Sequence, residues 1–552
     1  MSTFMGLETA RRAMSTAQFA LHTTGHNIAN ANTPGYTRQR VNFVQTEPFP
    51  AAAMNRPQIP GQVGTGVAAG SVQRVREQFL DVQFRNELSK FGYWTARHEG
   101  LVKMEDIMNE PSEQGLANTI DRFWQSLQDL AAQPEDAGAR AVVRQRGEAV
   151  ADTFRYAHDS LSALRRDIGD EIDTVEKEVN SLLQQINSLN KQIGETEPHG
   201  YVTNDLYDER DRIVDRLAEL VNIKTERVVS GGKPSPIAEG RLTIHFVDST
   251  GNTFGPPLVD GSNPDNLLGI KVSFSENNLV QNIGFGQIGD DSRVAEVTGL
   301  FGDTTEAFNA NGKLKGLIEV FGYTTGEVDA LGNPAGKGLY PKMLSDLDEM
   351  AFVFATQFNE IHESGWSLNE INNGKPEGTG VSFFRDLGNA GHNATGILSF
   401  SEADKIGFAS RIAVSNDVRN SLDNLAASGA AGANGVRGEA FAGDGSNALK
   451  LANMKDVRFT FNGSNGSVQS FYRSVIGDMA VDTSEAARRK NNSDVLLHNI
   501  QRNKDAVSSV SLDEELTNMI QFQHAYNAAA RNITMIDEML DRIINGMGVV
   551  GR

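Results

Sequence analysis

A seam of apolar residues, spaced alternately by four and three positions, runs through residues 168 to 193. Its members are Ile168, Ile172, Val175, Val179, Leu182, Ile186, Leu189 and Ile193. A 3.5-residue repeat of this length predicts a long helix packed along a partner helix. Residues 197 to 200, Glu-Pro-His-Gly, end that helix because proline cannot continue it, and an apolar stripe resumes at Leu206, Ile213, Leu217 and Leu220. The pattern therefore predicts an antiparallel helical hairpin.

Both ends of the chain carry narrower apolar stripes. Near the start, Leu7, Met14, Leu21 and Ile28 recur every seven residues, with Phe4, Ala10, Ala17 and Thr24 at the intermediate positions. The stripe near the end comprises Leu516, Met519, Tyr526, Ala530, Ile533, Ile536, Leu540, Ile543 and Met547. Each stripe predicts a helix that fits one or two partner helices. Ordinary core helices would show the same pattern. The position of the stripes at both chain ends favours a coiled coil between the termini, with sides left free for neighbouring subunits.

The middle of the chain is rich in turn signals. Residues 231 to 466 hold 35 of the 54 glycines and five of the six Asn-Gly pairs, which are strong hairpin signals. Leu242, Ile244 and Phe246 alternate with polar residues, as in a half-buried strand. A helix is predicted at residues 340 to 364 by the apolar face of Met343, Leu347, Met350, Phe354, Phe358 and Ile361. This helix divides the β-rich middle into two insertions.

These patterns predict an α+β multidomain fold with a terminal α-helical coiled coil, a long-helix bundle domain and two β-rich insertions. The terminal coiled-coil assembly domain is assigned to residues 1–35 and 513–552. The helical bundle domain, which includes an extended segment, is assigned to residues 36–225, 339–366 and 468–512. The first β-rich insertion spans residues 226–338, and the second spans residues 367–467.

Composition excludes several kinds of chemistry. The 552 residues include no cysteine, so disulfides, thiolate nucleophiles and thiolate metal sites are absent. A net charge of −20, with 51 basic against 71 acidic residues and no block of Lys or Arg, excludes a nucleic-acid partner. No apolar run approaches the roughly 18 residues of a spanning helix, and the residues after Arg11 and Arg12 are too polar for a cleavable secretion signal. We therefore expect a soluble chain without membrane insertion.

Candidate sites for catalysis, metals and cofactors are weak. His22 and His26 have the spacing of two metal ligands on a helix, but the Glu of an H-E-x-x-H pattern and a third ligand are missing. The glycine-rich residues 61 to 66 are not followed by Gly-Lys-Ser/Thr, so we expect a loop or strand edge and no phosphate site. We interpret Trp94, Trp124 and Trp366 as packing residues. No metal and no cofactor are expected.

Paired carboxylates of the kind that glycosidases use remain possible, because 71 acidic residues allow many chance pairs. The acids along the long helix, for example Asp170 and Glu171, fit a solvated helix face better.

Polar residues crowd the end of the first predicted helix. Asn27, Asn30 and Asn32 come just before Thr33-Pro34-Gly35-Tyr36. Pro34 prevents continuation of the helix and Gly35 permits a positive φ, so the chain turns and becomes extended. A helix C-cap followed by a turn accounts for these residues structurally.

The stretch from Asn27 to Arg40 closely resembles the N-terminal signature of the bacterial flagellar rod, hook and hook-associated proteins. Residues 64–80 are similar to the extended segment that follows it in that superfamily, and residues 512–541 are similar to its C-terminal helix. The resemblance assigns the family's signature turn to Asn27, Asn30, Thr33, Pro34, Gly35 and Tyr36. It also assigns the assembly interface to the two terminal stripes, Leu7, Met14, Leu21, Ile28, Leu516, Met519, Tyr526, Ala530, Ile533, Leu540 and Ile543.

The central helical region indicates which branch of the superfamily is nearest. Residues 316–319 (Gly-Leu-Ile-Glu), 340–350 and 358–365 resemble the hook-associated proteins that join hook and filament. A glycine-rich segment at residues 322–338 stands where a shorter link is expected, which leaves the boundary of the first insertion open. The resemblance covers the ends and the helical domain, whereas the two insertions rest on composition alone.

The resemblance implies a structural protein of bacterial motility and no enzyme. Such a chain would be exported unfolded by the flagellar type III apparatus and would polymerise outside the cell, through its coiled coil, into a ring or helical turn at the hook-filament junction. The implied partners are the hook protein, a second junction protein and a cytoplasmic export chaperone on the C-terminal helix. Two alternatives stay open: a surface-exposed glycan hydrolase or protease on the outer insertions, or an adhesin there.

Overall fold

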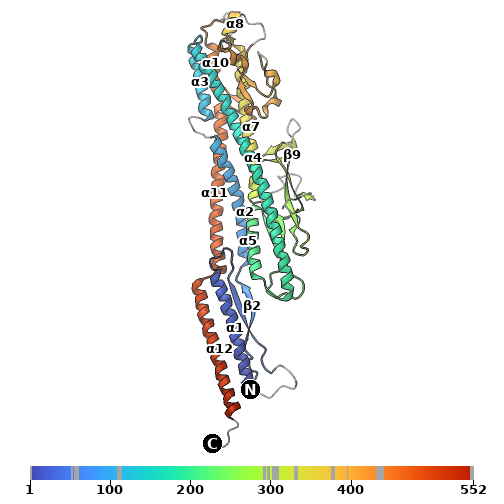
Figure 1. The fold of residues 1–552 in the computed structure, drawn as a ribbon. Coiled ribbons are helices and arrows are strands. Elements are labelled where there is room, and N and C mark those ends of the chain that lie inside the picture. The colour runs from blue at the N-terminus through green and yellow to red at the C-terminus, as the bar shows by residue number, and fades with distance from the viewer. Residues whose placement is uncertain are drawn as a thin grey trace.

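The computed structural model describes residues 3–50, 54, 61–108, 115–275, 277–289, 294, 299–300, 310–328, 334–373, 380–393, 396–429 and 440–546. The molecule is a long rod, as Figure 1 shows. Both termini lie at one end of the rod, and residues from the second predicted insertion lie at the other. The chain therefore runs out along the rod and returns.

Two antiparallel helices form the narrow end of the rod. They are α1 (Thr3–Ala29) and α12 (Leu512–Gly546), and they contact one another. A hairpin of β1 (Gln39–Gln45) and β2 (Val67–Arg74) also packs on α1. The helices predicted at both chain ends are confirmed, and the hairpin is an addition that the apolar stripes did not indicate.

Long helices form the middle of the rod. They are α2 (Gln78–Met108), α3 (Leu116–Ala132), α4 (Ala137–Thr196), α5 (Asn204–Leu220), α7 (Leu339–Ser364) and α11 (Val468–Ser508). The N-terminus of α4 is capped by the Asp136 side chain, which accepts hydrogen bonds from the Gly138 and Ala139 N–H groups. Its C-terminus leads into a 3-10 turn, Glu197–His199, that Gly200 closes with φ 85°. Since α5 follows directly and contacts α4, the predicted helical hairpin is confirmed.

All eight residues of the predicted apolar seam are buried in α4. The seam packs against strands as well as helices, which its repeat alone could not show. Two asparagines beside it attach the strands to α4 by pairing their amides with a strand backbone. Asn180 bonds both the N–H and the carbonyl of Ile270, at 2.8 and 3.0 Å, and Asn190 bonds Leu242 in the same way, at 3.0 and 2.8 Å. The strands are thereby held in register with α4.

The first predicted insertion contains two sheets, an antiparallel one and a mixed one in which β7 and β9 pair in parallel. One has the order β3-β4-β5, from β3 (Ile223–Val228), β4 (Arg241–Val247) and β5 (Thr253–Val259). The other has the order β10-β9-β7-β6, with β8 paired to β7, from β6 (Leu268–Phe274), β7 (Val280–Gln287), β8 (Gly299–Leu300), β9 (Tyr323–Val328) and β10 (Pro334–Lys337). A helix, α6 (Lys313–Phe321), interrupts them and contacts α2 and α4. The glycine-rich composition predicts the sheets but gives no indication of this helix.

The described part of the second predicted insertion holds fewer strand residues than its glycine content predicts. Its strands have two or three residues each: β11 (Trp366–Ser367), β12 (Phe384–Asp386), β13 (Ile412–Val414), β14 (Ala426–Ser428), β15 (Phe459–Phe461) and β16 (Ser464–Gly466). Short helices lie between them, namely α8 (Leu368–Asn373), α9 (Asn416–Asn420), α10 (Ser446–Asn453) and 3-10 turns at Ala390–Asn393, Glu402–Lys405, Phe408–Ser410, Leu422–Asn424 and Met454–Asp456. Glycine and Asn-Gly mark turns, and turns connect irregular chain as readily as strands.

An aromatic cluster fixes this end of the rod to the long helices. Phe383 and Phe384 have ring centroids 4.7 Å apart and pack against Phe358 of α7. Trp124 of α3 is buried beside the same cluster. Trp366 is buried too, and Trp94 lies under the Arg489 guanidinium, 4.9 Å from its centroid. Packing roles for the three tryptophans are therefore confirmed.

Replacing Gly92 with alanine is expected to destabilise the helical body by about 1 to 3 kcal/mol. Alanine normally stabilises a helix interior relative to glycine by about 1 kcal/mol. Here a Cβ would collide with the Glu219 carbonyl oxygen and lie 3.2 Å from the Lys313 nitrogen, and backbone atoms cannot move aside cheaply. Urea unfolding measures the change. The matched control is Gly25→Ala in α1, where a Cβ meets no atom within 4 Å, and an equal effect of both substitutions would contradict the packing argument.

Candidate assembly interface

The α1–α12 pair brings together the two predicted terminal stripes, although neither forms a fully buried seam. Leu7, Met14, Leu21 and Ile28 are half-buried, as are Met519, Tyr526, Ala530, Ile533 and Leu540. Leu516 and Ile543, by contrast, are 50% and 44% exposed. The buried side chains of α1 are small: Ala10, Thr16, Ala17, Ala20, Thr23, Thr24 and Asn27. The buried face of α1 is therefore formed by small side chains, including the seven-residue series Ala10, Ala17 and Thr24, while the heptad of large residues is half-buried.

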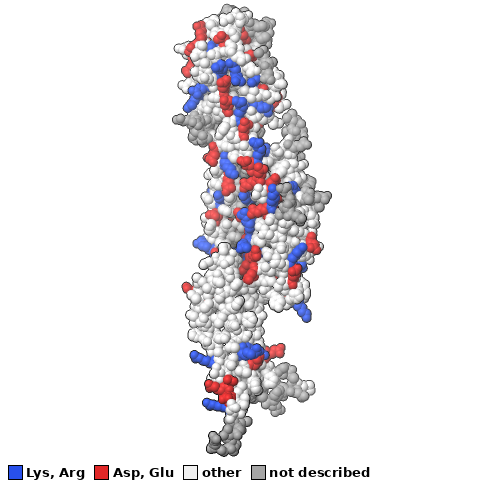
Figure 2. Space-filling view, viewed as in Figure 1, with Lys and Arg blue, Asp and Glu red and all other residues white. Residues whose placement is uncertain are grey.

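The β1–β2 hairpin covers part of this helix pair. The Thr16 hydroxyl donates to the Val67 carbonyl at 3.2 Å, and the Phe43 ring meets the edge of Phe522 on α12 at 5.8 Å. Figure 2 shows that charged side chains gather over the helical body, whereas the adjoining part of the terminal pair shows almost none. The part of the terminal pair next to the helical body therefore shows apolar and uncharged polar side chains, and charged ones appear nearer its far end.

Asn27 holds the signature turn together. Its buried side-chain amide donates to the Gln39 carbonyl at 2.8 Å and to the Glu515 carboxylate at 3.1 Å. Its oxygen accepts from the Tyr36 hydroxyl at 2.7 Å and from the Gln39 N–H at 3.0 Å. One side chain thus joins α1, the turn, β1 and α12, and every hydrogen-bonding position of the amide is used.

The remaining turn residues act locally. The Asn30 oxygen accepts from the Thr33 hydroxyl at 3.1 Å, and the Asn30 amide donates to the His26 carbonyl at 3.1 Å. Gly35 has φ 80°, so the expected positive φ is confirmed, and Pro34 is exposed. His26 lies with its ring edge on Tyr36 and 3.5 Å from Asp205, so it belongs to the turn.

Glu515 links the turn to the start of α12. Its side chain is 2% exposed and accepts from the Arg38 Nε at 2.8 Å as well as from Asn27. Arg38 also pairs with Glu514 at 2.6 Å, and its N–H donates to the Ser508 carbonyl at 2.9 Å. Burial raises the pKa of Tyr36 well above its usual range, and the Asp205, Asp208 and Glu515 carboxylates add to the effect, so the Tyr36 hydroxyl remains a donor.

A buried cluster of ion pairs lies where the terminal pair meets the helical body. At its centre the Asp211 carboxylate receives Arg76 at 2.9 Å, Arg74 at 3.0 Å and Arg85 at 3.3 Å. Burial alone would raise the pKa of Asp211, but the guanidiniums of Arg76, Arg74 and Arg85 outweigh it and hold that pKa far below its usual range. The carboxylate is therefore charged at every physiological pH.

Further carboxylates extend the cluster between elements. Asp208 accepts from Arg74 at 2.6 Å and from the Thr37 N–H at 3.0 Å, while Asp215 joins Arg85 at 2.6 Å to Lys504 of α11 at 3.0 Å. The cluster joins β2, α2, α5 and α11. It was not predicted from the sequence. A signal was present, because Asp208, Asp211 and Asp215 follow steps of three and four, which place them on one face of α5.

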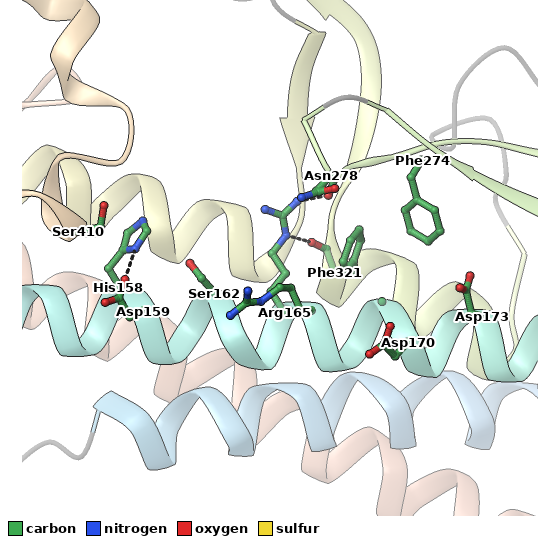
Figure 3. Close-up of a pocket in the computed structure, with 12 residues that line it drawn as sticks. His158, Asp159, Ser162, Arg165, Asp170, Asp173, Phe274, Asn278, Phe321 and Ser410 are labelled. Atoms are coloured by element: carbon green, nitrogen blue, oxygen red, sulfur yellow. Dashed lines mark hydrogen bonds and ion pairs between the residues drawn. The ribbon is translucent and has the colours of Figure 1, made fainter. Parts of the chain in front are cut away.

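A groove of about 880 Å³ lies on α4, away from the terminal pair. Figure 3 shows Arg165 reaching across it, where the Nε donates to the Phe321 carbonyl at 2.9 Å and the guanidinium also bonds the Asn278 carbonyl. Arg165 thus fastens the β6–β7 turn and the end of α6 to α4, which is a structural task. In the part of the chain that the structure describes, no three His, Asp or Glu side chains form a metal-binding group, and no helix is long and apolar enough to cross a membrane.

Three family models match the chain. The model described as flagellar hook-associated protein FlgK helical domain matches residues 101–384. The model described as flagella basal body rod protein matches residues 7–37, and the one described as flagellar basal body rod FlgEFG protein C-terminal matches residues 506–546. The two terminal matches coincide with α1 and its turn and with α12.

Individual proteins match over nearly the whole length. The chain is 42% identical to flagellar hook-associated protein 1 of Bacillus subtilis (strain 168) over 552 residues, 100% of both chains. It is 25% identical to flagellar hook-associated protein 1 of Escherichia coli (strain K12) over 98% of this chain and 99% of that protein. The solved structure of the flagellar hook junction protein FlgK from Burkholderia pseudomallei matches with a TM-score of 0.56 at 14% identity, covering 78% of this chain and 100% of that chain, and so has a similar fold.

Proposed function

The chain belongs to the flagellar hook-associated protein 1 family, and on that premise we propose that it is the structural subunit that joins hook and filament in a bacterial flagellum. The single observation that carries this conclusion is 42% identity over the full length of both chains. The family is one of structural flagellar proteins, so the chain is a structural protein and not an enzyme. This identity confirms the family that the sequence motifs indicated.

The terminal pair is the part that we assign to assembly, with residues 1–35 and 513–552 as the polymerising domain and the remainder as the outer body. Support comes from large apolar side chains that are exposed on these helices, namely Phe19, Leu512, Leu516, Ile520, Met535, Met539, Ile543 and Ile544. Contiguous apolar surface of this kind is typical of a protein–protein contact. Burial against neighbouring subunits would offset the entropy of ordering the two helices.

The partners in this proposal are the hook protein on one side, the second junction protein on the other and further copies of this chain. The chain would travel unfolded through the flagellar type III apparatus and assemble outside the cell. A cytoplasmic chaperone would hold α12 before export, since its exposed apolar residues would otherwise promote aggregation. The predicted stripe from Leu516 to Met547 is where we place that contact, and Met547 lies outside the described residues.

Deleting the gene and imaging the flagella tests the proposed function. Cells that lack this chain are expected to carry hooks without filaments, and the unsubstituted gene is expected to restore the filaments. Filaments of normal length on the deleted cells would refute the junction role. Assays of the purified chain on peptidoglycan and casein test the enzyme alternative, and we expect no turnover of either.

The substitution Ile520→Asp is expected to reduce filament number more than tenfold while the melting temperature changes by less than about 2 °C. Ile520 is 56% exposed in the monomer, so a carboxylate there stays solvated until a neighbouring subunit covers it. Filament counts and calorimetry supply the two measurements. Val481→Asp is the control, because Val481 is 66% exposed on α11, outside the terminal pair. A large fall in melting temperature for Ile520→Asp would place the side chain in the monomer core instead.

A further inference from the structure

The two helices of the terminal pair share a belt that has no Asp, Glu, Lys or Arg. Residues 13–37 contain none of these four residue types, and neither do residues 516–530. The antiparallel pairing places the two stretches side by side, since Asn27 bonds Glu515 at one end and Gly6 lies against Ile536 toward the other. The uncharged belt is visible in Figure 2, with charged side chains above and below it. Its length is about 25 Å at 1.5 Å per helical residue.

A groove of about 650 Å³ opens between α1 and α12 at the lower edge of the belt. Its lining combines small residues with larger apolar ones such as Met5, Met535 and Ile536, and the small ones include Gly6, Ala10, Ala13, Gly64, Ala525 and Ala528. Small side chains leave room for larger apolar side chains from outside and let a second helix approach closely. The groove is therefore shaped to receive aromatic or branched aliphatic side chains.

The belt also carries large apolar side chains that point away from the groove. Phe19, Leu516 and Ile520 are 59%, 50% and 56% exposed. Ile520 and the groove-lining Ala525 are five positions apart, a rotation of about 140° around α12, so they face different sides of the helix. The side chains of one copy cannot reach the groove of the same copy.

We propose that this groove receives Phe19, Leu516 and Ile520 of a second copy of this chain. The proposal rests on the proposed function, because it names the contact through which the terminal pairs polymerise. Since groove and side chains lie on different faces, the contact is heterologous and repeats from copy to copy. The exposed side chains lie roughly 15 to 20 Å from the groove along the helix axes, so successive copies are displaced axially by about that distance.

The absence of charged side chains on the belt distinguishes this contact from the rest of the surface. A second copy that presents its own belt brings no Asp, Glu, Lys or Arg against the groove. The contact is then made by apolar burial and close packing without ion pairs, and screening by salt does not weaken it. An uncharged apolar surface fits this groove, and the belt of another copy of the same chain supplies one.

Cysteine crosslinking tests the contact directly, because the natural chain has no cysteine. Cells carry the double variant Ile520→Cys, Ala528→Cys in place of the natural gene, and their isolated hook-filament structures are oxidised mildly. The two positions are about 12 Å apart on one helix. A disulfide needs Cα atoms within about 7 Å, so only two different copies can be joined. We expect a ladder of covalent multimers from the double variant, equal at low and high NaCl, and monomers from each single variant.

Two outcomes would overturn the proposal. A disulfide-linked dimer from either single variant would show that the same face of two copies meets. Monomers from the double variant, in structures with normal filaments, would show that the groove of one copy does not contact Ile520 of another. A second variant covers the case in which the cysteines prevent assembly: Ala528→Trp fills the groove and is expected to reduce filaments more than tenfold, whereas Ala480→Trp, also exposed but on α11, leaves them unchanged. Normal filaments with Ala528→Trp contradict the groove contact alone, while the junction role stands or falls on the gene deletion.

Discussion

Replacing Asp211 with alanine is expected to lower the free energy of unfolding of the helical body by about 3 to 5 kcal/mol. The Asp211 carboxylate is buried and receives Arg76, Arg74 and Arg85 within 2.9 to 3.3 Å. Removing it leaves three buried guanidinium groups with less opposite charge, and Asp81, Asp208 and Asp215 compensate their mutual repulsion only in part. Loss of one partner from a buried ion network is among the most destabilising single changes.

The pH dependence of this effect has a definite sign. The arginines hold the folded-state pKa of Asp211 below the ordinary value of about 3.9. A carboxyl with a lowered folded-state pKa contributes stability that is fully present above its unfolded pKa and is lost as pH falls through the folded one. The difference between the natural chain and Asp211→Ala is therefore expected to be constant from pH 5 to 8 and to shrink in acid below about pH 4.

Urea unfolding followed by circular dichroism, repeated across that pH range, measures both quantities. Glu209→Ala is the matched control, because Glu209 lies on the same helix with its side chain 50% exposed and 3.6 Å from Arg212. We expect the control to change stability by less than about 0.5 kcal/mol. Equal effects of the two substitutions would show that the buried network contributes no more than a surface pair.

The sequence predicted those parts of the fold that repeat locally. The 3.5-residue seam in α4 and the Pro-Gly break after it depend on residues that are neighbours in the chain, so the helical hairpin followed from the pattern. Asn180 and Asn190 could not be predicted to attach two sheets to α4, because their partners Ile270 and Leu242 are 90 and 52 residues away. The helix α6 was hidden because its nine residues are too few for a periodic signal within glycine-rich flanks.

In the candidate interface, too, the local contacts could be predicted from the sequence and the distant ones could not. The turn at Asn30, Thr33 and Gly35 is made by contacts between near neighbours, and Pro34 with Gly35 indicated it. The partner of Asn27 on α12, Glu515, is 488 positions away and required the fold. The stripes identified the two helices, and Ala17 and Thr24, at the intermediate positions of the first stripe, are buried.

Replacing Asn27 with alanine is expected to loosen α1 and α12 from the signature turn and to abolish filament assembly. The substitution removes four hydrogen bonds and leaves the buried Gln39 N–H and carbonyl without their side-chain partner. Unsatisfied buried groups of this kind cost about 2 to 3 kcal/mol together, after allowance for water that enters. Local opening at the turn should then rise about 30- to 150-fold.

Trypsin cleavage at Arg38 and Arg40 measures this opening, and filament counts measure its consequence. Arg38 is held by Glu515 and Glu514 and by its own N–H bond to Ser508, so it becomes a substrate only when the turn opens. Asn32→Ala is the matched control, since Asn32 is exposed in the same turn. We expect it to leave both readings unchanged.

Glu515→Gln separates the hydrogen bond of Asn27 from the ion pair with Arg38. The amide oxygen of glutamine can still accept from Asn27, whereas the charge that Arg38 requires is gone. If Asn27 is the joint, Glu515→Gln accelerates cleavage less than Asn27→Ala does and keeps some filaments. If Glu515→Gln is the more damaging of the two, the ion pair with Arg38 holds the termini to the body and Asn27 is not the central joint.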